Sequence, residues 1–270
     1  MSQKSALMNW IEVNGTSLRY ELSGAGERVL VLVHEMGGTL DSWDQVMPLL
    51  SPGRRVLRHD WRGAGMSEKL RAPPTFDLLA DDIAALLDAV GIAGPVALAG
   101  CAVGAGIALN FALRHPDRTK AVVAMAPATG VTPERRAATL ARAEAMETVG
   151  PRGLVEQSFA GSYPPAVRHD PEQFRRFRAR WLANDPESFA AMNRMLADAT
   201  VTERLPLIAC PVLLIAGTHD ALRPPSLIEP LAARMQNARF RALETSHFMA
   251  VQTPGIVAEA IGEFLTSVGC

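Results

Sequence analysis

The stretch "LAGCAVGAG" at residues 98–106 decides the fold of this chain. It joins an apolar run, "PVALAG" at 95–100, to the helical pattern "VGAGIALNFAL". Gly100 and Gly104 flank Ala102, and the absence of side chains at these two positions lets a strand turn sharply into a helix. The stretch therefore predicts a buried strand, a tight turn centred on Ala102, and a buried helix.

Strand and helix patterns alternate on both sides of this turn. Short apolar or β-branched runs predict strands at 28–33, 54–59, 95–100, 121–126, 211–217 and 238–243. Apolar residues recur at helical spacing between 75 and 92 and between 254 and 265. This alternation predicts an α/β fold with a doubly wound, mostly parallel sheet. Two earlier strand patterns, on either side of Asn14 and Gly15, predict a hairpin at the edge of the sheet.

Each of the two predicted helices has one apolar face. The face of the first helix consists of Leu78, Ile83, Leu86 and Leu87. The face of the second helix consists of Ile256, Ile261 and Leu265. We expect both faces to pack on the sheet.

The alternation stops between residues 128 and 205. Three helical patterns, "PERRAATLARAEAMETV", "DPEQFRRFRARWLA" and "DPESFAAMNRMLADA", follow one another there without a strand. The segment is too long for a simple crossover between strands. We predict a helical lid at 128–205, inserted into a core formed by 1–127 and 206–270 and lying over the sheet edge where open α/β sheets bind ligands.

Composition narrows the class of partner and the compartment. The net charge is −1 with acidic and basic residues mixed, which favours a small-molecule partner over nucleic acid or a membrane surface. The three cysteines, Cys101, Cys210 and Cys270, lack the spacing of a disulfide framework or a zinc site. The N-terminal residues lack the apolar core of a signal peptide. We therefore expect a cytoplasmic protein.

Residues 90–113 carry no charge and have the length of a membrane span. Six glycine or proline residues interrupt this segment: Gly91, Gly94, Pro95, Gly100, Gly104 and Gly106. The segment is therefore predicted to be a buried strand followed by a buried helix.

Several segments, in their order along the chain, resemble motifs of one enzyme superfamily. They are "VLVHEMGG" at 31–38, "DWRGAGMS" at 60–67, "GCAVG" at 100–104, "GTHDALRP" at 217–224 and "TSHFMAVQTP" at 245–254. Together they resemble the α/β-hydrolase superfamily over almost the whole chain. The closest resemblance within it is to the lidded hydrolases around 3-oxoadipate enol-lactonase.

The resemblance implies an α/β-hydrolase fold, a catalytic triad and an oxyanion hole. The triad positions are Ala102 for the nucleophile, Asp220 for the acid and His247 for the base. The oxyanion hole would be formed by the backbone N–H groups of Met36 and Val103. No cofactor and no metal are implied. Ala102 departs from the family's serine and cannot form the acyl bond.

Four further residues are candidates for substrate contact: Glu35, Arg175, Arg178 and Trp181. Glu35 replaces the glycine that is usual in its loop, and the alternative is a carboxylate that braces the loop. The arginines could pair with a carboxylated substrate, and the alternative is a solvated helix face. Trp181 could line the pocket or belong to the core of the lid.

Other polar residues near these motifs are expected to be structural or exposed. His34 and Asp60 are assigned to loop structure, and His219 to the surface. Cys101 is expected to face away from the site, because neighbouring residues of a strand point in opposite directions.

Three hypotheses account for Ala102. The chain is a Ser-to-Ala inactive version of a hydrolase, a pseudoenzyme that binds a ligand without catalysis, or a cofactor-free enzyme that uses only a His and Asp dyad. The first is favoured, because alanine keeps the strained turn and removes only the oxygen. The favoured function is therefore a serine-type hydrolase of a small ester or lactone, with C–C bond hydrolysis of a diketone as the alternative within the fold. The sequence leaves the substrate and the oligomeric state open.

Overall fold

A computed structural model describes residues 9–270 and contains an eight-stranded sheet. The first eight residues, which belong to the segment assessed for a signal peptide, lie outside the described part. The strands are β1 (Asn9–Val13), β2 (Thr16–Gly24), β3 (Val29–Val33), β4 (Arg55–His59), β5 (Val96–Cys101), β6 (Thr119–Met125), β7 (Val212–Gly217) and β8 (Ala238–Leu243).

The strand order is β1-β2-β4-β3-β5-β6-β7-β8. β1 pairs antiparallel with β2, and β2 pairs antiparallel with β4. All later pairs are parallel. The predicted mostly parallel sheet is confirmed, and so is the hairpin at its edge. In the parallel register Val33 lies opposite Gly100, so the loops after β3 and β5 leave the sheet side by side.

Helices cover both faces of the sheet. One face carries α2 (Phe76–Ala89), α3 (Val103–Arg114) and α8 (Pro225–Ala232). The other face carries α1 (Met47–Leu50), α9 (Met249–Gln252) and α10 (Pro254–Ser267). In β3, Val31 and Val33 point to the first face and Leu30 and Leu32 to the second. The alternation buries both faces of the strand, as parallel sheets require.

Two helix faces differ from the prediction by one residue. In α2 the residues buried near the start are Phe76 and Leu79, and Leu78 is only partly buried. In α10 Ile256 is 39% exposed and Val257 is fully buried. The spacing identified both helices correctly but placed the first apolar residue of each face wrongly, because the direction from which the sheet approaches sets the buried stripe.

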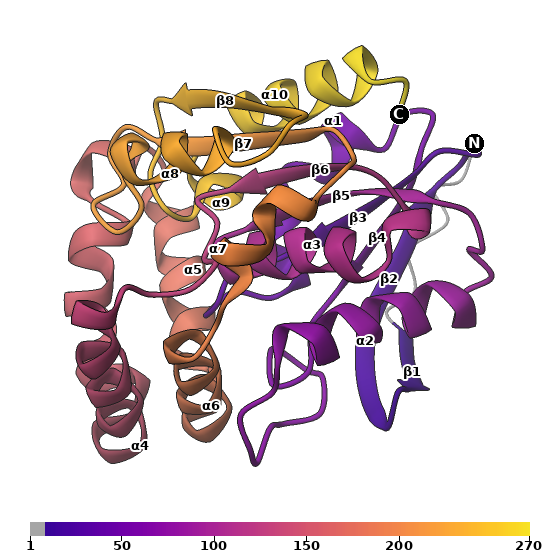
Figure 1. The fold of residues 1–270 in the computed structure, drawn as a ribbon. Coiled ribbons are helices and arrows are strands. Elements are labelled where there is room, and N and C mark those ends of the chain that lie inside the picture. Colours follow the sequence, from indigo (N-terminus) through magenta and orange to yellow (C-terminus); the bar gives the residue numbers. More distant parts are fainter. Residues whose placement is uncertain (1–8) are drawn as a thin grey trace.

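Between β6 and β7 the chain is helical. The elements are α4 (Pro133–Ser162), a 3-10 turn (Pro165–Val167), α5 (Pro171–Leu182), α6 (Pro186–Ala197), α7 (Val201–Arg204) and a second 3-10 turn (Leu205–Leu207). Figure 1 shows α4, α5 and α6 together at one end of the sheet, on the side of the molecule opposite both termini. α4 bends at Gly150, just before Pro151. The boundaries of a lid at 128–205 stay a prediction.

An aromatic cluster joins these helices to the loop after β8. Phe159, Phe177 and Trp181 come from the helical segment, and Phe248 comes from the loop. The rings of Phe177 and Phe248 lie 4.7 Å apart between centroids. Buried aromatic contacts of this kind fix the position of the helical segment over the sheet edge.

The uncharged segment at 90–113 forms β5 and much of α3, both of which are buried. Within residues 9–270 no helix has the length and apolar character needed to cross a membrane.

Two buried histidines make the stability of the fold depend on pH. Burial lowers the pKa of His34 to about 4 and that of His59 to about 3. An unfolded histidine titrates near ~6.5, so the contribution of each histidine is complete above that pH and is lost as the pH falls toward the folded value.

We expect His59 to lower the free energy of unfolding by roughly 2 kcal/mol between pH 7 and pH 5. The measurement is urea unfolding of the unmodified chain and of His59→Gln at both pH values. The variant should lose less stability than the unmodified chain over this interval. An equal loss in both proteins would show that His59 does not remain neutral in the folded state.

Candidate active site

The turn between β5 and α3 is strained at Ala102. This residue has φ 52° and ψ −113°, a region that residues with a Cβ rarely adopt. Backbone hydrogen bonds hold it there: its N–H donates to Met125, 2.8 Å away, and its carbonyl accepts from Ala128, 2.9 Å away. Strain of about 1–3 kcal/mol persists only where the surroundings enforce it.

Close packing explains the two glycines of the turn. A Cβ at Gly100 would lie 2.3 Å from the carbonyl oxygen of Gly104. A Cβ at Gly104 would lie 2.3 Å from the carbonyl oxygens of Val33 and His34. Only hydrogen fits at either position. The turn is therefore pressed against the loop that follows β3.

His247 and Asp220 form a buried pair at the carboxyl ends of β7 and β8. The distance from Nδ1 of His247 to Oδ2 of Asp220 is 2.8 Å. The other oxygen, Oδ1, accepts from the backbone N–H groups of Leu222 and Arg223, at 2.8 and 3.0 Å. Burial alone would raise the pKa of Asp220, but His247 and these hydrogen bonds lower it. Asp220 is therefore an anchored carboxylate that pairs with Nδ1 of His247, and Nε2 takes no part in this pair.

Cys101 connects the histidine loop to the turn. Its thiol donates to the carbonyl oxygen of His247, with an S···O distance of 3.2 Å, and it is fully buried. Burial raises the pKa of the Cys101 thiol well above its usual range. A thiol held in this state is a poor nucleophile. The contact brings the backbone of His247 next to the residue that precedes Ala102.

The backbone N–H groups of Met36 and Val103 have no acceptor among residues 9–270. Val103 is the first residue of α3, where N–H groups lack helical partners. Both N–H groups lie at the closely packed loops described above. Unpaired N–H groups in such a position are suited to bind an oxyanion.

Trp181 fixes the loop next to Met36. It is 1% exposed, and a Cβ at Gly37 would collide with its indole ring, 2.4 Å from Cδ1. Asn184, just after α5, donates to the carbonyl oxygen of Gly37 at 3.0 Å. The structure thus places Trp181 between the helical segment and this loop. A contact of Trp181 with substrate stays a prediction.

Glu35 is fully buried beside the same loop. Its Oε1 accepts from the hydroxyl of Ser42 at 2.7 Å, while Oε2 has no partner among residues 9–270. Burial raises the pKa of Glu35, and this outweighs the Ser42 hydrogen bond and the charges of Arg180 and His247. Ser42 was not among the residues singled out from the sequence, because nothing in the motif marks the hydroxyl seven positions later.

The arginines of α5 occupy two different environments. Arg175 is 69% exposed and pairs with Glu172, and Arg178 pairs with Glu156 at 2.7 Å. Arg180 has a buried Nε without an acceptor, and no carboxylate pairs with it in the part of the chain described. It lines a cavity of about 180 Å³ together with Ser42 and four carboxylates, Asp41, Asp44, Asp170 and Glu172, and its charge interacts with that of Asp41.

The sequence does contain a signal for Arg180. It follows the fully buried Phe177 by three residues and precedes the buried Trp181 by one, so helical spacing places it at the edge of the packed face. The binding role predicted for Arg175 and Arg178 stays a prediction, although both are engaged in surface ion pairs.

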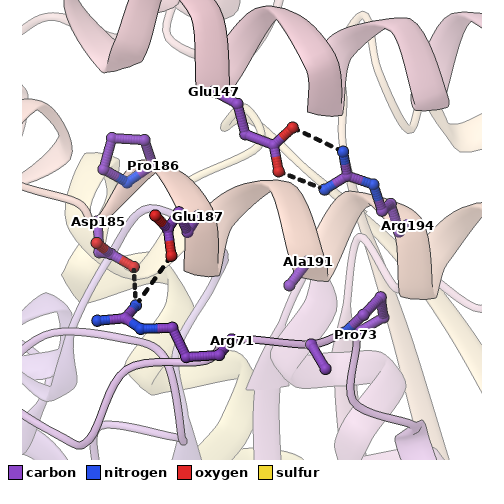
Figure 2. Close-up of a pocket in the computed structure, with 9 residues that line it drawn as sticks. Arg71, Pro73, Glu147, Asp185, Pro186, Glu187, Ala191 and Arg194 are labelled. Carbon is purple, nitrogen blue, oxygen red and sulfur yellow. Dashed lines mark hydrogen bonds and ion pairs between the residues drawn. The ribbon is translucent and has the colours of Figure 1, made fainter.

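A surface groove of about 450 Å³ lies where α4 and α6 meet the loop before α2 (Figure 2). Its charges pair with one another. Glu147 binds Arg194 through two contacts of 2.7 Å, and Arg71 approaches Glu187 at 3.3 Å and Asp185 at 3.6 Å. These pairs join the helical segment to itself and to the core. None of the predicted site residues lines this groove.

Three polar residues of the motifs lie in structural or exposed positions. His34 is fully buried, and its ring stacks on Trp61 with centroids 5.0 Å apart. Asp60 accepts from the N–H groups of Leu40 and Met66, at 2.7 and 2.8 Å. His219 is partly exposed and lies 4.0 Å from Glu244. Asp60 thus braces two loops and takes no part in the arrangement around Ala102.

The cysteines are free thiols. Within residues 9–270 no three His, Cys, Asp or Glu side chains lie close enough together to hold a metal ion.

Comparison with known proteins defines the class. The serine aminopeptidase S33 family model matches residues 24–248, and the chain belongs to this family of the α/β-hydrolase superfamily. It is 30% identical to the "Putative carbamate hydrolase RutD" of Caulobacter vibrioides over 264 residues, which cover 92% of this chain and 95% of that protein.

Two solved structures are also similar. The enol-lactonase from Burkholderia xenovorans LB400 has a TM-score of 0.89 and 28% identity, with 96% of this chain and 100% of that chain covered. A thermophilic esterase from Thermogutta terrifontis has a TM-score of 0.89 and 27% identity, with 97% and 99% covered. The α/β-hydrolase fold and the resemblance to the enol-lactonase subgroup are confirmed.

The buried Glu35 gives a second test of the electrostatics. Because burial raises the pKa of Glu35, its contribution to stability is complete below the unfolded value near ~4.3 and is lost as the pH rises through the folded value. We compare the free energies of unfolding of Glu35→Gln and of the unmodified chain. The variant should gain stability relative to the unmodified chain as the pH rises from 5 to 9. Urea unfolding at several pH values measures this difference.

The matched control is Glu244→Gln, because the side chain of Glu244 is 85% exposed. Its replacement should change the free energy of unfolding little at each pH, because an exposed carboxylate contributes little to stability. A pH-independent difference for Glu35→Gln as well would mean that Glu35 titrates as an ordinary carboxylate.

Proposed function

We propose that this chain binds a small ester or lactone at Ala102. The site is of the serine-hydrolase type, but it lacks the nucleophile that would form a covalent acyl-enzyme. His247 is the base, Asp220 orients it, and the N–H groups of Met36 and Val103 receive the carbonyl oxygen. With a serine at position 102, its hydroxyl would attack the acyl carbon while His247 took the proton. Alanine offers no oxygen, so no acyl-enzyme forms.

The observation that carries this proposal is the strained turn at Ala102 together with the hydrogen-bonded pair of His247 and Asp220. A chain without use for a side chain at this position would relax with glycine, yet Ala102 keeps φ at 52°. The His247–Asp220 distance of 2.8 Å supports a base held in one orientation. The esterase and the enol-lactonase that this chain resembles support the ester and lactone classes.

A carboxylate on the substrate would find a partner in Arg180. The guanidinium has a buried nitrogen without an acceptor, and it lies close enough to His34 and Glu35 for their charges to interact. Arginine binds carboxylates through paired N–H groups. Arg175 and Arg178 already pair with glutamates, so Arg180 is the better candidate for this contact.

We expect Ala102→Ser to create hydrolysis of p-nitrophenyl acetate and of small lactones. Loss of the nucleophile in one serine protease costs about a millionfold in turnover, so a gain of at least ~10³-fold is expected here. Release of p-nitrophenol measures it, and mass spectrometry should detect an acetyl adduct on the variant alone.

In the Ala102→Ser background, His247→Ala and Asp220→Asn should each remove most of the gain. The surface variant His219→Ala serves as control and should retain it. A serine variant no more active than the unmodified chain on a broad ester and lactone panel would overturn the proposed function. A gain that survives the loss of both His247 and Asp220 would show that the base has been misassigned.

We expect Arg180→Gln to weaken binding of carboxylated esters by roughly 10-fold or more, the size of a lost charge-assisted hydrogen bond. Calorimetry with monomethyl succinate, glutarate and adipate measures this, and the corresponding dimethyl esters report binding of neutral ligands. Arg175→Gln is the control, because Arg175 pairs with Glu172 at the surface. Equal losses for Arg180→Gln on charged and neutral esters would mean that Arg180 only shapes the site.

A further inference from the structure

Glu35 is a buried acid that the proposed triad and oxyanion hole leave unused. Its Oε1 is held by Ser42, its side chain is fully buried, and its Oε2 has no partner among residues 9–270. A buried polar atom without a partner costs about 1–3 kcal/mol. A carboxyl anchored on one oxygen and free on the other is therefore arranged to meet a ligand or a water molecule.

The carboxyl lies near the candidate site, in the loop that supplies one of its backbone donors. Glu35 directly precedes Met36, whose N–H is one of the two unpaired donors. Its charge interacts with that of His247, and it contributes to the raised pKa of Cys101, which directly precedes Ala102. Two groups that can exchange protons thus lie near the turn: the imidazole of His247 and the carboxyl of Glu35.

The state of the carboxyl suits an acid. Burial raises the pKa of Glu35 in spite of the Ser42 hydrogen bond and the charges of Arg180 and His247. A carboxyl whose pKa is raised keeps its proton to higher pH and can donate it to a leaving group. His247, paired with Asp220, is the base.

We infer that Glu35 is a second proton-transfer residue of this site, and that with His247 it lets water hydrolyse an ester or lactone bound at Ala102 without an acyl-enzyme. This inference rests on the proposed function for the ligand class. It adds a route that the chain can use as it stands, because water, and not a hydroxyl at position 102, is the nucleophile.

Every proton transfer in this route has a donor and an acceptor. His247 Nε2 takes a proton from water while the water oxygen bonds to the acyl carbon, and the carbonyl oxygen becomes an oxyanion bound by the N–H groups of Met36 and Val103. The bond from the acyl carbon to the leaving oxygen then breaks, and that oxygen takes the proton of Glu35. The imidazolium of His247 returns a proton to Glu35. The products are an acid and an alcohol, or a hydroxy acid from a lactone.

The test compares two esters that differ in the basicity of the leaving group. Phenolate needs a proton more than p-nitrophenolate does, so an acid at Glu35 matters more for phenyl acetate. For the chain as it stands, we expect Glu35→Gln to reduce hydrolysis of phenyl acetate by roughly 100-fold and that of p-nitrophenyl acetate by less than ~10-fold. A residue that only braced the loop would slow both esters alike, and that result would overturn the inference.

The Ala102→Ser background provides a matched comparison. There His247 delivers the proton to the leaving group after taking it from the serine, so Glu35→Gln should cost only a fewfold on phenyl acetate. An equal fractional loss in both backgrounds would show that Glu35 acts through the fold. Circular dichroism and dimethyl adipate affinity establish whether each variant is folded and binds.

If Glu35→Gln does not fold, the unmodified chain alone can test whether an internal acid assists the leaving group. Its ratio of p-nitrophenyl to phenyl acetate rates should be smaller than the ratio for hydroxide in the same buffer, because an internal acid assists the poorer leaving group. An equal ratio, an acetyl adduct on the unmodified chain, or no turnover above buffer would overturn the inference. The proposed function fails separately, when Ala102→Ser gains no hydrolysis.

Discussion

The site depends on the packing of Gly104 against the loop after β3. A Cβ at Gly104 would meet the carbonyl oxygens of Val33 and His34 at 2.3 Å, so α3 approaches the sheet more closely than a side chain allows. The positive φ at Ala102 accompanies this close approach, and the first N–H of α3 is unpaired because it begins the helix. One steric constraint thereby sets the position of residue 102 and places two backbone donors, from Met36 and Val103, beside it.

Much of the fold follows from patterns that act locally. The six predicted parallel strands agree with β3 to β8 within two residues at each end, because a buried strand needs a continuous apolar run that turn residues bound. The errors at Leu78 and Ile256 are of a different kind. A helix face is defined to about one residue by spacing alone, and the last choice belongs to the sheet that packs against it.

The candidate site was predictable only where a motif fixes a backbone position. The order of the segments predicted Ala102, Asp220 and His247 as triad positions; Asp220 does contact His247, and the catalytic roles stay predictions. The sequence motifs did not indicate Ser42, because its hydrogen bond to Glu35 depends on how the loop from 35 to 42 folds back on itself. The sequence favoured Arg175 and Arg178 over Arg180, because the three share one helix and differ only in the neighbours that tertiary packing supplies.

Two buried carboxyls, those of Asp220 and Glu35, bear on whether the site at Ala102 still binds a ligand. A site that had lost its use would be free to lose the buried Asp220 carboxylate, whose burial is unfavourable unless His247 and two N–H groups compensate it. It would also be free to replace Glu35, whose second oxygen finds no partner in residues 9–270. Both carboxyls lower the stability of the fold when their contacts are incomplete. The contacts of Asp220 are complete within the fold, so Glu35 is the carboxyl whose free oxygen the proposed ligand or a water molecule would have to satisfy.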